Sequence, residues 1–493
     1  MASFPLDKYV VGVETLNRRQ PLIRVRPTYV AMIPTLLLGF VALADLPSIS
    51  HVRVPEDPFE PVQIRQAYAG PTGMLVSWNT FSKLPEPPTV QYGFTPHFLP
   101  FVSSHKNAES VTYPTSLTFN NHVRLTNLFP NTKYFWRPSF ANESSIFSFT
   151  TSREAGDHTP FTTAVVVDLG LIGPDGLSTT VGKGAANPLK PGEINTIQSL
   201  QQDSNWEFLW HPGDIAYADY WLKEEVQGFL PNTSVADGFH VFESLLNQFY
   251  DEMTPITSQK AWMVGPGNHE ANCDNGGTHG FDVTICIPGQ TNFTGFRNHF
   301  RMPSSESETD LGHGLIGPDQ PGGEGGEDSG PFGLANQQIN WLKNDLKNVD
   351  RKKTPWVIAA GHRPWYVSGT ACTECQEAFE SILNQYSVDL VFSGHFHVFE
   401  RVAPIFNGTV DLNELNNPKF PWYITNGAAG HYDGLDTLND VLAPFSRAAI
   451  DTDYGWSRLM FHNCTHLTHE FVRSADGAVL DSATLFKDRK CRI

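Results

Sequence analysis

At 493 residues the chain is longer than one hydrophobic core usually serves, so we expect more than one domain. Its composition, 40% hydrophobic, 12% aromatic and 17% charged, excludes a disordered chain. The formal net charge of -18 argues against nucleic acid or an anionic membrane surface as the main partner, because both bind basic surfaces. An anionic substrate would need locally concentrated positive charge, which metal ions supply.

The N-terminal segment is predicted to be a targeting sequence. A basic stretch from Arg18 to Arg26 precedes an apolar run from Tyr29 to Ala44 that ends in Ala-Leu-Ala. This run is interrupted by Pro34 and is shorter than the roughly 20 residues of a membrane-spanning helix. We expect residues 1–44 to be a signal peptide, with an uncleaved anchor as the alternative, and a secreted, extracellular or cell-wall protein. Five sequons fit such a route through glycosylation at Asn142, Asn232, Asn292, Asn407 and Asn463.

The six cysteines lie in three neighbouring pairs along the chain. In an oxidising compartment this spacing indicates three local disulfides, Cys273–Cys286, Cys372–Cys375 and Cys464–Cys491, although other connectivities remain open. The Cys372 and Cys375 spacing also fits a redox motif or half of a zinc site, but no second such pair is present to complete four thiolate ligands. We therefore favour a structural disulfide for this pair.

The first folded segment is predicted to be all-β. From Val62 to Thr151, short β-rich runs alternate with turn residues and no helical stretch lies between them. This pattern indicates a small β-sandwich, which we place at residues 56–152. Within it, Leu128 to Tyr134 looks like the tyrosine corner of fibronectin type III domains, in which a tyrosine hydroxyl pins the connection between the two sheets. We interpret this domain as a packing or dimerisation module, because it contains no cluster of titratable groups.

The remaining chain is predicted to be an α/β domain. After Pro160, short β-branched or aromatic runs alternate with helical stretches. These helical stretches are Val241 to Met253, Leu334 to Lys347 and Cys375 to Tyr386. We place a catalytic domain at residues 160–420 and expect residues 421–493 to complete it.

Five predicted strands of this domain end in side chains able to bind metal. The residues that follow these strands are Asp168 after TTAVVV, Asp214 after EFLWHPG, Asn268 and His269 after AWMVGPG, His362 after WVIAAG, and His395 and His397 after VDLVFSG. Because ligands gather at the carboxyl ends of strands in open α/β sheets, we expect one polar site. Oxygen and imidazole donors suit iron, zinc or manganese, and a carboxylate can bridge two ions. The sequence therefore predicts a pair of metals.

Each motif alone has a structural interpretation. Asp168-Leu-Gly170 is a common turn, Tyr217 alone is usually a packed aromatic residue, and a single buried histidine is usually a core residue. Gly394-His395-Phe-His397 is more specific, because it places two imidazoles on the same face of a strand or turn. The combination of all the motifs at strand ends favours a metal site over a structural role.

The order of these motifs resembles the metallophosphoesterase superfamily, and within it the purple acid phosphatases of plants and fungi. The resemblance covers residues 56–493 and rests on DLG, GDIAY, GNHE, a lone histidine before PWY, and GHFH followed by Glu400-Arg401. It implies an N-terminal fibronectin III-like β-sandwich followed by a two-sheet α/β/β/α sandwich. It also implies a phosphate monoesterase that works without a phosphoenzyme.

The resemblance assigns a role to each candidate ligand. Asp168, Tyr217 and His397 correspond to ligands of Fe(III), and Asp214 corresponds to the bridge. Asn268, His362 and His395 correspond to ligands of a divalent ion, which is zinc, iron or manganese. Tyr217 is the most telling of these residues, because in the purple phosphatases that phenolate binds ferric iron and produces the colour.

The resemblance also implies how substrate is bound. His269 resembles the proton donor to the leaving alcohol, with a role in orienting its neighbours as the alternative, and it binds substrate together with Asn268. Arg363 is expected to meet the phosphate, and His431 to lie near the site. Expected substrates are small-molecule phosphate esters, including phytate; we infer no nucleic acid and no specific protein partner, and leave a homodimer open. The alternatives are a phosphodiesterase or nucleotide pyrophosphatase, and an inactive glycoprotein.

The chain departs from the family pattern at two places. Plant members carry a paired histidine shortly after PWY, where this chain has Val367-Ser-Gly369, so substrate binding is expected to differ in detail. After Met302-Pro303, family members have a strand pair resembling WYSFD and HFVSLD, which this chain omits before Glu308-Thr-Asp310. We expect two core strands to be absent near residue 307. Their loss leaves a sheet edge unpaired, which underlies the inactive alternative.

Overall fold

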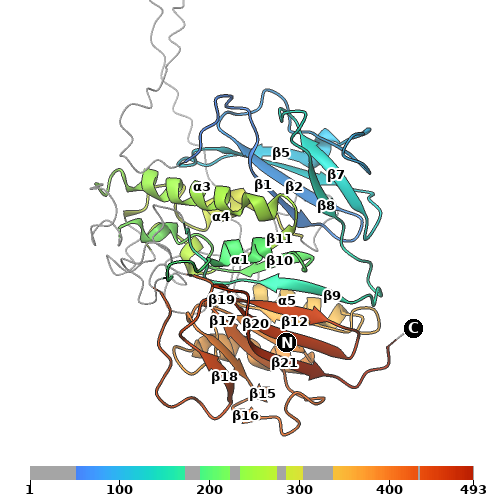
Figure 1. The fold of residues 1–493 in the computed structure, drawn as a ribbon, viewed down its shortest axis with the longest axis vertical. Coiled ribbons are helices and arrows are strands. Elements are labelled where there is room, and N and C mark those ends of the chain that lie inside the picture. The colour runs from blue at the N-terminus through green and yellow to red at the C-terminus, as the bar shows by residue number, and fades with distance from the viewer. Residues whose placement is uncertain are drawn as a thin grey trace, which may run out of the picture. The chain divides into compact units, whose positions relative to one another are not determined.

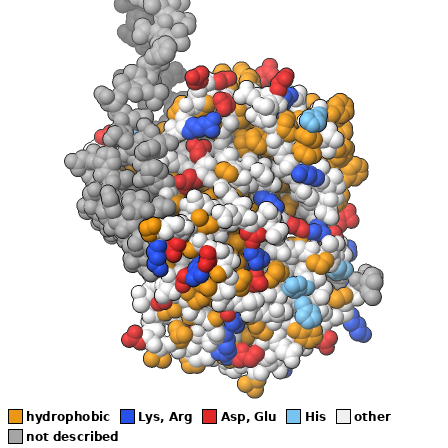
Figure 2. All heavy atoms as spheres, in the orientation of Figure 1, with side chains coloured by type: hydrophobic (Ala, Val, Ile, Leu, Met, Phe, Trp, Pro, Cys, Tyr) orange, Lys and Arg blue, Asp and Glu red, His pale blue; other side chains and the backbone are white. Residues whose placement is uncertain are grey.

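The computed structural model describes residues 52–172, 189–222, 234–274, 285–303, 337–430 and 434–491. The predicted signal peptide, the Asn232 sequon and His431 lie outside these ranges. Within them, no helix combines the length and the apolar character that a membrane span needs. On the face drawn in Figure 2, basic and acidic side chains are interspersed, and the basic ones form no continuous patch.

The N-terminal part is the predicted β-sandwich. One sheet has the order β1 (Val62–Tyr68), β2 (Met74–Thr80), β6 (Phe119–Leu125) and β5 (Ala108–Val111). The other has the order β4 (Phe101–Val102), β3 (Val90–Gly93), β7 (Lys133–Pro138) and β8 (Phe147–Thr150), and a 3-10 turn, η1 (His105–Asn107), precedes β5. Trp78 and Trp136 are fully buried between the sheets. The tyrosine corner is confirmed, because the Tyr134 hydroxyl accepts a hydrogen bond of 2.9 Å from the Phe129 amide.

Two further sheets form the second part of the chain (Figure 1). The first has the order β11 (Ala261–Gly265), β10 (Phe208–Pro212), β9 (Phe161–Val165), β19 (Gly455–Phe461), β20 (His466–Arg473) and β21 (Val479–Phe486). The second has the order β12 (Ile358–Ala360), β13 (Leu390–Ser393), β17 (Trp422–Asn426), β14 (Phe399–Val402) and β18 (Ser446–Ile450), with a hairpin of β15 (Ile405–Phe406) and β16 (Thr409–Val410) beside it. Strands β9 to β11 run parallel, as do β12, β13 and β17. Apolar side chains from both sheets, such as Val165 and Phe392, share one core.

Helices cover the outer face of each sheet. On the first sheet lie α1 (Thr196–Gln202), α3 (Gly238–Thr257) and α4 (Thr294–His299); on the second lie α5 (Gln337–Asn348) and α6 (Thr373–Gln385). Asn195 is the N-cap of helix α1, and its side chain accepts from the Gln198 amide in a capping box. Because helices lie outside two packed sheets, the α/β/β/α architecture is confirmed.

Helix α3 also contacts the β-sandwich, and its position between the two parts is visible in Figure 1. The buried carboxylate of Glu243 accepts hydrogen bonds from the Tyr113 hydroxyl at 2.7 Å and the Thr115 hydroxyl at 2.6 Å. Nearby, the Gln63 amide donates to the Asn247 side chain at 2.9 Å. The contact between α3 and the β-sandwich therefore includes buried hydrogen bonds, and its stability depends on the ionisation of Glu243.

Strand β12 is an edge strand in the described part of the chain, where it pairs with β13 alone. No strand lies between β11 and β12 among the described residues, which do not include residues 304–336, where the two strands were expected to be absent. A cleft of about 660 Å³ opens beside this edge, and its apolar walls come from both sheets. Those walls include Phe208, Trp210, Met263, Trp356 and Ile358. The sandwich of sheets is thus incompletely filled at this edge.

The three predicted disulfides form, joining Cys273 to Cys286, Cys372 to Cys375 and Cys464 to Cys491. The four sequon asparagines that the structure describes are all exposed: Asn142, Asn292, Asn407 and Asn463.

Candidate metal centre

The candidate ligands lie at the carboxyl ends of five strands, three in the first sheet and two in the second. Asp168, Asp214, Asn268, His362 and the histidines of the GHFH segment follow β9, β10, β11, β12 and β13 respectively. One ligand atom each of Asp214, His362 and His395 lies within 4.8 Å of the other two, an arrangement able to hold an ion. His362 Nε2 lies 2.8 Å from Asp214 Oδ2 and 3.9 Å from Asp168 Oδ1.

Tyr217 connects the second half of the cluster. Its hydroxyl donates to Asp168 Oδ1 at 2.8 Å and lies 3.3 Å from Asp214 Oδ2 and 3.1 Å from His397 Nε2. The His397 Nε2 atom is itself 3.7 Å from Asp168 Oδ1. Burial and the two carboxylates raise the pKa of Tyr217 well above its ordinary value. A bound cation would reverse that effect, because it stabilises the phenolate.

Four of these residues have strained backbones. Asp168, Asp214, Tyr217 and His395 have φ angles of 60°, 48°, 54° and 67°, in the left-handed region. Such a conformation costs on the order of 1 kcal/mol or more per non-glycine residue and is concentrated at functional sites. The surrounding structure therefore holds the ligands in place against their backbone preferences.

Glycines allow the ligand loops to approach one another closely. A Cβ atom on Gly267 would lie 2.1 Å from Asp214 Oδ1, and one on Gly394 would lie 2.3 Å from Asp168 Oδ2. Both contacts are far shorter than atoms tolerate, so a side chain at either position would displace a candidate ligand. The glycines of the GNHE and GHFH motifs thus have a steric role.

Glu270 organises the loop after β10, a role that the sequence did not reveal. Its carboxylate accepts from the backbone amides of Asp214 at 3.0 Å, Ile215 at 2.7 Å and Gly267 at 2.7 Å. These bonds tie the GDIAY and GNHE segments together behind the metal-facing atoms. The only sequence feature that pointed to this role is that Glu270 is the last residue of the GNHE motif.

The imidazole of His269 is held by Asp219, a residue that no sequence motif marked. His269 Nδ1 lies 2.6 Å from Oδ2 of the fully buried Asp219, and its Nε2 lies 3.8 Å from Asp214 Oδ2. Burial alone lowers the pKa of His269, but Asp219 and Asp214 together raise it to about 10. The imidazolium is thus favoured, with Nδ1 directed at Asp219 and Nε2 toward the ligand cluster.

Replacing Asp219 by asparagine is expected to lower kcat about 10- to 100-fold, because His269 loses the carboxylate that orients and charges it. The alkaline limb of the pH–rate profile should move to lower pH, since the pKa of His269 falls. Asp350→Asn, at an exposed position, is the matched control. An unchanged profile in Asp219→Asn, measured by steady-state kinetics from pH 4 to pH 11, would remove His269 from the proton-transfer role.

His397 is clamped by Asp436. The His397 amide donates to Asp436 Oδ2 at 2.8 Å, and the Asp436 amide donates to the His397 carbonyl at 3.1 Å. His397 Nδ1 lies 4.0 Å from the same carboxylate oxygen, so Nε2 is the nitrogen that faces Tyr217. Asp436 lies in the C-terminal segment, and no sequence motif marked it.

The predicted substrate residue Arg363 is buried directly after His362. Its charge contributes, after burial and His362, to holding the pKa of His395 well below the ordinary value. Arg363 therefore acts electrostatically on the cluster.

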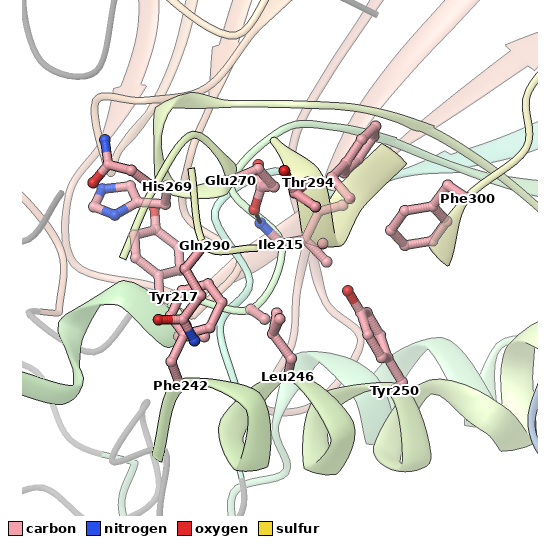
Figure 3. Close-up of a pocket in the computed structure, with 15 residues that line it drawn as sticks. Ile215, Tyr217, Phe242, Leu246, Tyr250, His269, Glu270, Gln290, Thr294 and Phe300 are labelled. Atoms are coloured by element: carbon pink, nitrogen blue, oxygen red, sulfur yellow. Dashed lines mark hydrogen bonds between the residues drawn. The ribbon is translucent and has the colours of Figure 1, made fainter. Parts of the chain in front are cut away.

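A small cavity of about 20 Å³ lies behind the cluster, large enough for about one water molecule. Figure 3 shows Phe242, Leu246 and Tyr250 extending from α3 toward it, with Phe242 on the side of Tyr217 and Tyr250 on the side of Phe300. The α3 side of this cavity is therefore largely apolar. The ring of Tyr217 itself packs against those of Tyr220 and His269, with ring centroids 5.5 Å and 4.3 Å away.

The donor set fits a pair of metal ions. Two buried carboxylates, a phenol, an amide and three imidazoles are the ligands that iron, zinc and manganese take, and no thiolate is among them. Asp214 stands between the two halves of the cluster, with one oxygen near both His362 and Tyr217. That position suits a carboxylate that bridges two ions.

Comparison with known proteins agrees with this geometry. The family model for the purple acid phosphatase N-terminal domain matches residues 61–151, that for calcineurin-like phosphoesterases matches residues 183–399, and that for iron/zinc purple acid phosphatase-like protein C matches residues 420–482. Acid phosphatase A of Cryphonectria parasitica is 36% identical over 505 residues, covering 92% of this chain and 96% of that protein. The chain belongs to the purple acid phosphatase family.

Membership makes the protein a phosphatase of the metallophosphoesterase class, and the family is an iron- and zinc-dependent one. Probable purple acid phosphatase 20 of Arabidopsis thaliana is 27% identical, covering 90% of this chain and 93% of its own. The purple acid phosphatase PPD1 of yellow lupin has the same fold, with a TM-score of 0.67 at 21% identity over 88% of this chain and 75% of its own. The alignment with the Cryphonectria enzyme has 505 positions, more than the residues in the 92% of this chain that it includes. The Cryphonectria enzyme therefore has residues at some aligned positions where this chain has a gap.

Proposed function

We propose that this family member is a secreted acid phosphatase that hydrolyses small-molecule phosphate monoesters, phytate among them, at a pair of metals. One observation carries the proposal: the Tyr217 hydroxyl lies among ligand-type side chains, 2.8 Å from Asp168, 3.3 Å from Asp214 and 3.1 Å from His397. Burial and the two carboxylates oppose ionisation of Tyr217, so a phenolate here needs a bound cation, and ferric iron is a suitable one.

We assign Fe(III) to Asp168, Tyr217 and His397, which lie together on one side of Asp214. The divalent ion, which is zinc, iron or manganese, is assigned to Asn268, His362 and His395. Asp214 would bridge the two ions. The grouping of Asp214, His362 and His395 within 4.8 Å and the contacts of Tyr217 support this division.

A phosphate monoester is anionic and repels an anionic nucleophile, so its charge must be neutralised before attack. When bound, the two cations neutralise that charge and lower the pKa of water to supply the nucleophile. His269 then donates a proton from Nε2 to the leaving alcohol oxygen, while Asp219 holds Nδ1. Arg363 binds a phosphate oxygen, and Asn268 positions the ester. No side chain forms a covalent bond to phosphorus in this scheme.

Secretion and glycosylation form part of the proposal. The basic and apolar pattern of residues 1–44, three disulfides and the exposure of the four described sequon asparagines support it.

The proposal is tested by comparing kcat/KM at pH 5 for p-nitrophenyl phosphate, phytate and bis(p-nitrophenyl) phosphate. We expect both monoester substrates to be hydrolysed at least about 100-fold more efficiently than the diester. A preference for the diester would support the phosphodiesterase alternative instead. Absence of hydrolysis of all three by metal-loaded protein would support the inactive glycoprotein.

A further inference from the structure

The disulfide between Cys372 and Cys375 lies in the first turn of α6, and its surroundings differ from those of the other two disulfides. Cys372 is the N-cap residue of the helix, and Cys375 lies within the first turn. Among the three disulfides, this pair alone begins a helix and alone is separated by two residues. The spacing of Cys372 and Cys375 fits a redox motif, and so does the position of the pair at the start of a helix.

The two sulfurs are unequally accessible. Cys372 is partly exposed, whereas Cys375 is buried, with 4% of its surface accessible, and packs in the apolar cluster under α6. An incoming thiol therefore reaches Cys372 first. Cys375 Sγ is shielded from solvent, so it is placed to be the leaving group when the disulfide opens and to attack Cys372 when the disulfide forms again.

The structure also favours a thiolate on Cys372. The Cys375 amide donates to Cys372 Sγ at 3.2 Å, and the N-terminus of a helix of 13 residues stabilises negative charge at its N-cap. The exposed Glu374 in the same turn opposes this effect. The helix N-terminus, through the Cys375 amide, thus stabilises negative charge on the sulfur, and one carboxylate opposes it from the solvent side.

A purely structural role explains this disulfide poorly. Crosslinks restrict the unfolded chain less as the loop becomes shorter, and this loop is the shortest of the three, with a sequence separation of 3 against 13 and 27. The helix already holds the two residues together, because the Gln376 amide donates to the Cys372 carbonyl at 3.2 Å.

We propose that Cys372–Cys375 is a thiol–disulfide exchange site whose partner is a dithiol. One thiolate of the dithiol attacks Cys372 Sγ, the bond between the two protein sulfurs breaks, and its electron pair leaves on Cys375. The second thiolate of the dithiol then attacks its own sulfur in the mixed disulfide and releases the Cys372 thiolate. The dithiol is oxidised to a disulfide, both cysteines are reduced, and they take up the two protons that the dithiol loses.

The site is linked to the loop that carries His362 and Arg363. The Cys372 amide donates to the Pro364 carbonyl at 2.7 Å. One turn further along α6, the Gln376 side chain donates to the Tyr366 hydroxyl at 2.9 Å. The first turn of α6 is therefore hydrogen-bonded to a segment that begins two residues after the candidate ligand His362.

The selectivity of exchange is measured by differential alkylation. The folded protein is incubated with a graded series of reduced to oxidised dithiothreitol, quenched with acid, alkylated and examined by peptide mass spectrometry. We expect half-reduction of Cys372–Cys375 at a dithiol to disulfide ratio at least tenfold lower than for Cys273–Cys286. Equal ratios, or later opening of Cys372–Cys375, would overturn the proposal.

Matched single variants test which sulfur reacts. Cys375→Ser leaves Cys372 and is expected to form a mixed disulfide with oxidised glutathione at least tenfold faster than Cys372→Ser, which leaves only the buried thiol. Glu374→Gln in the Cys375→Ser background should accelerate the reaction further. A faster reaction of Cys372→Ser would overturn the assignment. Both measurements use mass and not catalysis, so their failure is distinguishable from failure of the proposed phosphatase site.

Discussion

Replacing Asp214 by asparagine is expected to lower kcat for a phosphate monoester about a thousandfold, the equivalent of about 4 kcal/mol of transition-state stabilisation. Asparagine keeps the shape of the side chain but loses the negative charge that a bridging ligand needs. Burial opposes ionisation of Asp214, yet His362 and His269 hold its pKa well below the ordinary value. Steady-state kinetics with p-nitrophenyl phosphate and metal analysis of the same sample measure the effect.

Asp345→Asn, on the exposed face of α5, is the control and should retain wild-type activity and metal content. Asp214→Asn should also bind fewer metal ions per chain, because the bridging position has lost its charge. If Asp214→Asn retained more than a tenth of wild-type kcat together with both metals, the bridging role would be wrong.

Glu243→Gln is expected to make the protein more stable at neutral pH. Burial raises the pKa of Glu243 from 4.5 to about 7, against the hydrogen bonds from Thr115, Tyr113 and Gln290. Because the folded state binds this proton more tightly than the unfolded chain does, the group's contribution is full below pH 4.5 and is lost as the pH rises through 7. The wild type should therefore lose about 3 kcal/mol between these values, and Glu243→Gln should not.

Urea unfolding of wild type and Glu243→Gln at pH 4.5 and pH 7.5 measures this difference, with Glu86→Gln at an exposed position as control. Glutamine keeps hydrogen-bonding capacity toward both hydroxyls, so the two proteins should be similar at the acidic pH. An equal loss of stability in both proteins on raising the pH would show that Glu243 does not titrate in this range. Its position between α3 and the sandwich suits an enzyme whose two parts hold together best in acid.

Much of the site followed from the sequence, because strand ends can be recognised without a structure. Asp168, Asp214 and His362 each follow a short apolar run, and the carboxyl ends of β9 and β10 in the first sheet meet that of β12 in the second. The tyrosine corner was equally readable, since it depends on a short local segment. These are features in which the local pattern determines position.

The supporting residues were not readable in the same way. Asp219 and Glu270 act through contacts with segments about 50 residues away, and Asp436 reaches His397 from the C-terminal segment. A carboxylate that will be buried and paired has no distinctive local pattern. Its role depends on tertiary packing, which the sequence alone does not show.

The open edge at β12 is intermediate between features that a local sequence pattern predicts and features that depend on tertiary packing. Comparison with a family pattern predicted missing strands, and the described residues show an edge strand beside an apolar cleft of about 660 Å³. The candidate ligands nevertheless converge, because each follows a strand that is present. The physical cost of this edge is to stability, since apolar walls and strand hydrogen-bonding groups lack partners there among the described residues.

Metal analysis with a visible absorption spectrum, on purified wild type and Tyr217→Phe, tests the central claim most directly. The account predicts iron and a second metal near one-to-one in the wild type, with a purple phenolate-to-iron band that Tyr217→Phe loses. A colourless wild-type protein without bound metal would contradict the claim that these side chains form a two-metal phosphatase site.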